Sequence, residues 1–101
     1  MNNEVSQIIT TQILENTLQV KNNVQNQFFG AMMCNTVLYS FTNTFYRDLK
    51  AQLFEYNIHV ELLLHDNSDT HNIIIQYQDI NIKLNVFLDH NNNSIGISFT
   101  T

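Results

Sequence analysis

Residues 38–56, with the sequence LYSFTNTFYRDLKAQLFEY, decide the fold of this 101-residue chain. At about 100° per residue, the turn angle of an α-helix, their apolar side chains fall on one side and most polar ones on the other. The apolar side carries Leu38, Phe41, Phe45, Tyr46, Leu49, Leu53 and Tyr56. The stretch is therefore predicted to be an amphipathic helix that begins nearer Ala31, ends at Asn57 and packs on a flat surface.

Residues 57–101 supply that surface, because apolar and polar residues alternate there with a period of two. Strands are predicted at residues 58–65, 72–78, 81–89 and 94–100, joined as an antiparallel meander by turns rich in Asn, Asp and Ser. The side chains predicted to face the helices are Ile58, Val60, Leu62, Leu64, Ile73, Ile75, Tyr77, Ile82, Leu84, Val86, Leu88, Ile95, Ile97 and Phe99. Pairing the strands through these turns sets buried residues opposite one another, and a slip by one residue would turn a strand inside out.

Residues 3–26 show a second helical pattern, which predicts a first long helix. Its apolar arc holds Val5, Ile9, Ile13, Val20 and Val24. The whole chain, residues 1–101, is thus predicted to be a single α+β domain. In it, two N-terminal helices (residues 1–56) pack on one face of a four-stranded antiparallel meander sheet (residues 57–101), giving two layers in the order ααββββ.

Composition excludes several classes of function. The net charge is −5, and the four Lys and Arg residues give no footprint for a phosphate backbone, so direct nucleic-acid binding is not expected. No phosphate-binding loop or other cofactor motif is present, so no cofactor is expected. No apolar run approaches the roughly 20 residues that cross a bilayer, and we expect no membrane partner. The single cysteine, Cys34, forms no internal disulfide and is interpreted as core filling, which favours a cytoplasmic protein.

Residues 28–37, FFGAMMCNTV, are apolar on all sides of a helical projection. One interpretation is a tight connection buried in the core, with Gly30 closing the first helix. The other is a helical segment in a subunit interface, where Met and aromatic residues are enriched. Phe28, Phe29 and Met32 are therefore candidates for partner binding.

The outer face of the sheet offers a second candidate surface. The predicted register sets Leu63 directly opposite Ile74 with Phe87 diagonal to them, and His59 and Glu61 lie on the same face. Such an apolar island is consistent with ordinary cross-strand packing or with a partner site.

One end of the sheet gathers His and Asp residues. The first and third loops of a meander emerge at the same end, which brings His71 and Asp69 near Asp89 and His90. These residue types suit a divalent cation or acid and base catalysis. They are also ordinary turn residues, and their spacing matches no ligand motif.

The last strand, SIGISFTT, is an edge without charge or proline. Unprotected edges invite pairing with another chain, so we expect a homodimer or strand addition by a partner.

These features favour a small acidic, non-enzymatic protein-interaction domain. We expect an inhibitor or adaptor that sterically occupies another protein. The many Asn, Ile, Phe and Tyr residues are typical of AT-rich genomes, so a phage, viral or mobile-element accessory factor, acting in the host cytoplasm if viral, is the leading hypothesis. The alternatives are a dimeric secretion-type chaperone, and a metal-dependent hydrolase or nuclease using His71, Asp69, Asp89 and His90.

Overall fold

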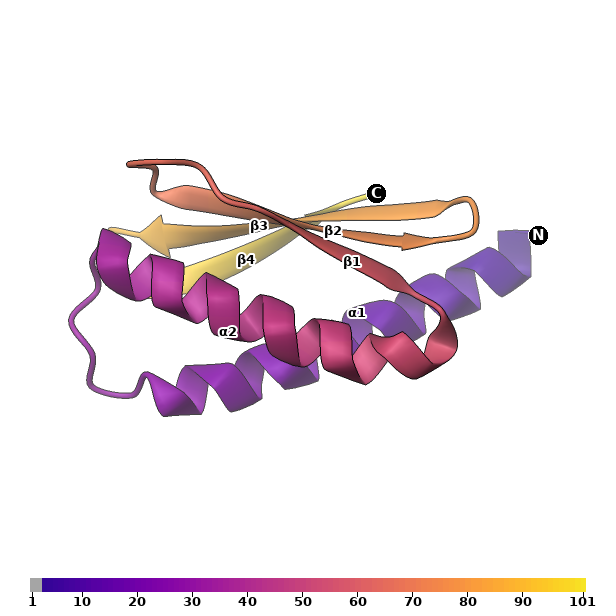
Figure 1. Cartoon of the computed structure of the whole chain (residues 1–101), viewed down its shortest axis with the longest axis horizontal. Coiled ribbons are helices and arrows are strands. Elements are labelled where there is room, and N and C mark those ends of the chain that lie inside the picture. The colour runs from indigo at the N-terminus through magenta and orange to yellow at the C-terminus, as the bar shows by residue number, and fades with distance from the viewer. Residues whose placement is uncertain (1–2) are drawn as a thin grey trace.

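The structure is a computed structural model that describes residues 3–101. Its elements are α1 (Asn3–Gln27), α2 (Asn35–Leu53), the 3-10 turn η1 (Phe54–Tyr56), β1 (His59–Leu63), β2 (Thr70–Tyr77), β3 (Ile80–Asp89) and β4 (Ser94–Thr100). The strands form one antiparallel sheet in the order β1-β2-β3-β4, and both helices lie on one face of it (Figure 1). The predicted α+β fold of two helices followed by a four-stranded meander is confirmed.

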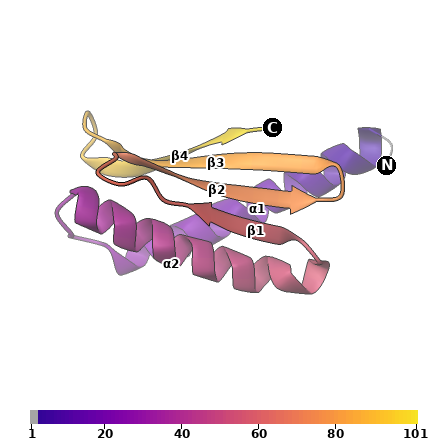
Figure 2. The ribbon, with the colours of Figure 1, turned by 45° about the horizontal axis from the view of Figure 1, so that its top comes forward.

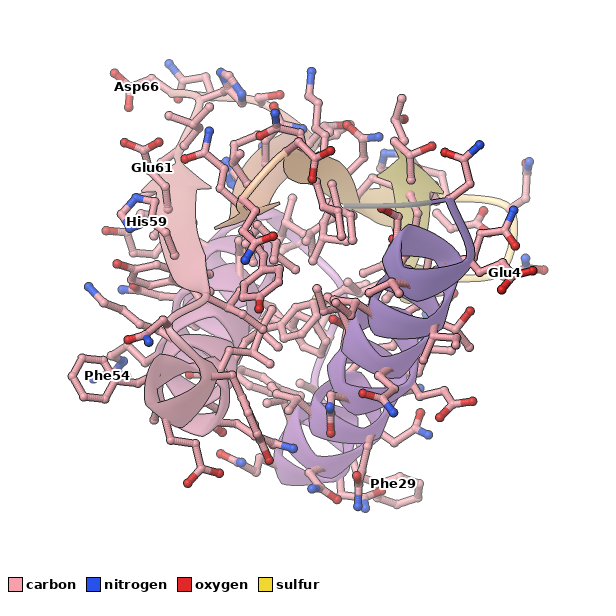
Figure 3. The ribbon with its side chains drawn as sticks, turned by 90° about the vertical axis from the view of Figure 1, so that its right-hand side faces the viewer. Glu4, Phe29, Phe54, His59, Glu61 and Asp66 are labelled. Carbon is pink, nitrogen blue, oxygen red and sulfur yellow. The ribbon has the colours of Figure 1, made fainter. Side chains whose placement is uncertain are left out.

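The helical layer and the sheet share one core. Figure 2 shows the four strands side by side in chain order, with both helices on one side of them. Seen end on, α2 lies beneath the β1 side of the sheet and α1 beneath the β4 side (Figure 3). The buried apolar side chains of the helices are Ile13, Val20, Val24, Leu38, Phe41, Phe45, Leu49 and Leu53. Those of the sheet are Val60, Ile73, Ile75, Ile80, Ile82, Leu84, Val86, Leu88 and Ile95.

Two helical residues predicted to be buried are exposed. Tyr56 is 55% exposed, because it lies in η1, where the α-helix tightens into a 3-10 turn. The tighter turn rotates its side chain away from the sheet. Val5 is 42% exposed, because it lies in the first turns of α1 and the buried positions of that helix begin only at Ile13. The core instead includes Thr17 and Thr42. Each hydroxyl donates to the carbonyl four residues earlier, at 2.7 Å, which satisfies it without water.

The second helix ends as predicted but begins later. Asn57 has φ 60°, the left-handed conformation expected of it. The prediction that the helix begins nearer Ala31 is wrong: α2 begins at Asn35, because Gly30 has φ 82° and Cys34 is extended. Cys34 is also exposed, so its interpretation as core filling is wrong.

The sheet has the predicted facing pattern but a different register between its first two strands. Leu63 lies opposite Asn72, and Ile74 lies opposite Glu61. The expected pairing of Leu63 with Ile74 is therefore wrong by two residues, because β1 ends at Leu63, two residues earlier than predicted, and its last pair is with Asn72. This shift keeps every side chain on its predicted face.

Two smaller differences accompany that register. Leu64, predicted to be buried, follows the end of β1 and is exposed. Ile80, predicted in a turn, begins β3 and is buried, because the hairpin needs only Gln78 and Asp79. Gln78 takes φ 52° to make that tight turn.

Candidate partner-binding surface

The connection between α1 and α2 belongs to a long uncharged part of the chain. Residues 22–46 contain no Asp, Glu, Lys, Arg or His, although the whole protein is acidic. They form the end of α1, residues 28–34 of the connection and the first half of α2. Depletion of charge together with aromatic and Met enrichment is the compositional mark of an interface core.

The connection is anchored at two points. The ring of Phe28 packs against that of Phe41 with their centroids 5.6 Å apart, and Met33 packs on the same core. Backbone bonds from Phe28 N–H to the Gln25 carbonyl and from Ala31 N–H to the Phe28 carbonyl hold the intervening turn. The segment is thus a fixed loop, with the positive φ of Gly30 at its bend.

Between these anchors the loop projects two large apolar side chains into solvent. Phe29 is 95% exposed and Met32 is 82% exposed. Figure 3 shows Phe29 pointing away from the helices, on the side opposite the sheet. Of the two interpretations of this segment, packing on the core holds for the half-buried Phe28, whereas Phe29 and Met32 stand on the surface.

A groove beside the connection extends the uncharged surface to the sheet. It has a volume of about 220 Å³, and its lining includes Phe28, Ala31, Met33, Phe41, Ser94 and Ile95. The start of β4 therefore lies next to the connection. Residues 91–95, which lead into β4 beside the groove, also carry no charged side chain.

The residues predicted on the outer sheet face do not form one apolar island. Ile74 lies opposite Lys83, whereas Phe87 lies opposite Thr70 and Gly96. Phe87 covers Gly96, since a Cβ atom built there would be 2.7 Å from Phe87 Cζ. His59 and Glu61 are exposed at the outer edge of β1 (Figure 3).

A row of polar side chains separates Ile74 from Phe87. Nε2 of His65 lies 2.7 Å from Oδ1 of Asn72, and Nδ2 of Asn72 donates to Oδ1 of Asn85 at 2.7 Å. Asn85 Nδ2 in turn donates to Ser98 Oγ at 3.2 Å. Sequence reasoning missed this row, although the shared outward parity of its strand residues was a usable signal. Its mutual hydrogen bonds make this strip a structural feature of the sheet.

The four predicted metal ligands do not form one cluster. The first and third loops do meet, because His90 Nε2 lies 2.9 Å from Asp69 Oδ2. The Asp89 carboxylate accepts bonds from the backbone N–H groups of Asn91 and Asn92, as a turn residue does. Within residues 3–101, no group of three or more His, Cys, Asp or Glu side chains is placed to hold a metal ion.

His71 lies in β2 on the helix-facing side, only 4% exposed. Its Nδ1 accepts a bond from the backbone N–H of His65 at 3.0 Å. Its ring meets that of Tyr39 edge-on, with the centroids 6.4 Å apart. Burial, and secondarily the neighbouring His65, lowers the pKa of His71 below its usual 6.5. A neutral His71 therefore ties the loop after β1 to the core.

Comparison with family models, curated proteins and solved structures finds no match to this chain. Neither helix of the described region is long and apolar enough to cross a membrane. Function is therefore inferred from the chemistry of the surface.

Proposed function

We propose that this protein is a small, non-enzymatic interaction domain that binds another protein through the connection between α1 and α2. The observation that carries the proposal is the near-complete exposure of Phe29 and Met32 on a loop whose two ends are anchored in the core. Burial of such a side chain contributes about 1.5–3 kcal/mol. Two of them on one anchored loop therefore form the binding hot spot.

The anchored loop favours binding in a second way. Association costs free energy when flexible loops and side chains become ordered. Phe28 and Met33 already fix the course of the backbone on either side of the exposed residues. The absence of charge in residues 22–46 also spares the complex the desolvation of ionised groups.

The mode of action that fits this surface is steric. A protruding apolar loop covers a site on its partner, and the acidic remainder of the domain keeps the complex soluble. We propose an inhibitor or adaptor, with a phage, viral or mobile-element accessory factor as the setting that the composition favours.

Affinity capture from the cells that naturally contain the protein tests this proposal. The bait is compared with a variant carrying Phe29→Ser and Met32→Ser, and with Phe54→Ser as the matched control. Phe54 is 77% exposed but lies at the end of α2, away from the connection (Figure 3). Thermal unfolding confirms that all three baits are equally folded.

The proposal predicts that at least one protein is recovered with the wild type and with Phe54→Ser, and falls at least tenfold with the double variant. Equal recovery of every captured protein by all three baits would contradict it.

A further inference from the structure

We propose that two copies of this chain pair through β4, antiparallel and centred on Ile97, to form one continuous eight-stranded sheet. The pairing uses the outer edge of β4 and is independent of the connection that binds the partner. It is an inference about a second binding surface of the same molecule.

The first support is the direction of the backbone groups in β4. In β3, the N–H of Leu88 donates to the Asp69 carbonyl at 2.9 Å, so the backbone N–H and C=O groups of Leu88 point toward β2. Alternate residues of a strand point to opposite sides. The backbone N–H and C=O groups of the neighbouring Asp89 therefore point toward β4, as do those of the other odd-numbered residues of β3.

The register carries this pattern into β4. The odd-numbered β3 residues lie opposite Ser94, Gly96, Ser98 and Thr100. Ile95, Ile97 and Phe99 consequently direct their N–H and C=O groups away from β3, and no strand among residues 3–101 pairs with that edge. The free edge offers a regular row of donors and acceptors.

The second support is self-complementarity. Centring an antiparallel pair on Ile97 sets Ile97 of one copy against Ile97 of the other, and Ile95 against Phe99 on either side. Apolar residues thus face apolar residues throughout the inner surface. Each facing pair exchanges two backbone hydrogen bonds, or about six across the junction.

The third support is the half-covered apolar surface beneath this edge. Ile97 and Phe99 face the helical layer but are only half-buried. Oδ1 of Asn16 in α1 accepts a hydrogen bond from Nε2 of Gln52 in α2, which identifies the side of α1 that faces α2. Leu18, about 200° further around the helix, faces the other way and is 44% exposed. In Figure 3, α1 lies beneath the β4 side of the sheet. The side of α1 that carries Leu18 would therefore face the second copy, and the pairing would bring the two Leu18 side chains toward each other beneath the junction.

Charge distinguishes this edge from the other one and favours a second copy as its occupant. Residues 91–101 carry no charged side chain, so the two-fold axis sets no like charges opposite each other within the β4 pair. The same operation on β1 would set Glu61, at the centre of that strand, against itself. Like charges directly opposite each other destabilise a strand pair.

Sedimentation equilibrium and residue-resolved amide exchange test the pairing on the wild-type chain. The proposal predicts a concentration-dependent species of twice the 11.8 kDa monomer mass. The amides of Ile95, Ile97 and Phe99 should exchange slowly in the dimer and rapidly after dilution to the monomer. A protein that stays monomeric up to about millimolar concentration would overturn the proposal, as would a dimer in which these amides remain unprotected.

Two variants sharpen the test. Ile97→Pro removes an N–H that the chain itself does not use, and should raise the dimer dissociation constant at least tenfold. Leu18→Glu, at an exposed site that tolerates substitution, should do the same even if the proline variant fails to fold. Phe54→Glu, on the opposite side of the helical layer, is the control. Equal weakening by the control, or no weakening by Leu18→Glu, would contradict the pairing.

Discussion

His71 links the stability of the folded chain to pH. Its Nδ1 atom accepts the His65 N–H, and a proton on that atom would set two donors against each other. Burial disfavours the charged ring as well, so the pKa of His71 in the folded chain lies below the ordinary 6.5. The unfolded chain therefore binds this proton more readily than the folded one. Stability from this group is complete above about pH 6.5 and is lost as the pH falls toward the lower folded pKa.

His71→Asn tests this linkage. The amide oxygen of asparagine offers the His65 N–H an acceptor but does not titrate, and the other histidines are unchanged. Between about pH 7.5 and about pH 5.5, we expect the urea midpoint of the wild type to fall further than that of the variant. The same fall in both proteins would show that His71 is not the linked group.

Phe87 and Gly96 are coupled across β3 and β4. A Cβ atom at position 96 would lie 2.7 Å from Phe87 Cζ, so the ring has to move when alanine is introduced. We expect Gly96→Ala to cost about 1 kcal/mol because it displaces a packed ring. In a Phe87→Ala background the same substitution should cost nothing or stabilise the chain.

A double-mutant cycle in urea measures this coupling. The Phe87→Ala single variant serves as the reference for the second arm. If Gly96→Ala costs the same free energy of unfolding in both backgrounds, Phe87 does not occupy the space above Gly96.

At the scale of the elements, periodicity predicted the helices and strands well. The buried face of α2 follows from the spacing of Leu38, Phe41 and Phe45, and the alternation in residues 57–101 gave every strand its correct inner side. The register between β1 and β2 could not be predicted, because parity excludes a shift by one residue but not by two. Which of these registers forms depends on where β1 ends and β2 begins.

Single-residue conformations explain the other differences between prediction and structure. The late start of α2 depends on the positive φ of Gly30 and the extended backbone of Cys34, neither of which leaves a periodic signal. The sequence indicated Phe28, Phe29 and Met32 as candidates but not which of them is exposed. Which of the adjacent Phe28 and Phe29 packs on the core depends on the turn that follows α1.

Asn57 closes the helical layer and allows the chain to enter β1. Its φ of 60° is tolerated by asparagine and glycine but costs most other residues about 1–2 kcal/mol. We expect Asn57→Gly to change the free energy of unfolding by less than about 0.5 kcal/mol. Asn57→Val should lower it by about 1–2 kcal/mol or more, because valine is also β-branched.

Urea denaturation of the two variants checks this account of the helix end. Both substitutions remove the same amide side chain, which controls for its loss. Equal stability of the glycine and valine variants would mean that the left-handed conformation does not constrain position 57.

At the scale of the whole molecule, the two proposed surfaces have a defined geometric relation. The groove beside the connection reaches Ser94 and Ile95 at the start of β4. An antiparallel pair centred on Ile97 places the starts of the two β4 strands at opposite ends of the junction. A dimer would therefore present two partner-binding connections, one at each end, and could bind bivalent partners with increased avidity.

In the proposed function, the exposed tip of the connection touches another protein in the cell. Site-specific photo-crosslinking tests it most directly, with a photoreactive phenylalanine analogue placed at position 29 or, as the control, at position 54. Both positions hold exposed phenylalanines, so neither substitution disturbs the core. We predict a discrete crosslinked adduct with another protein from position 29 and none of that mass from position 54. The same adducts from both positions, or none from position 29, would contradict the account.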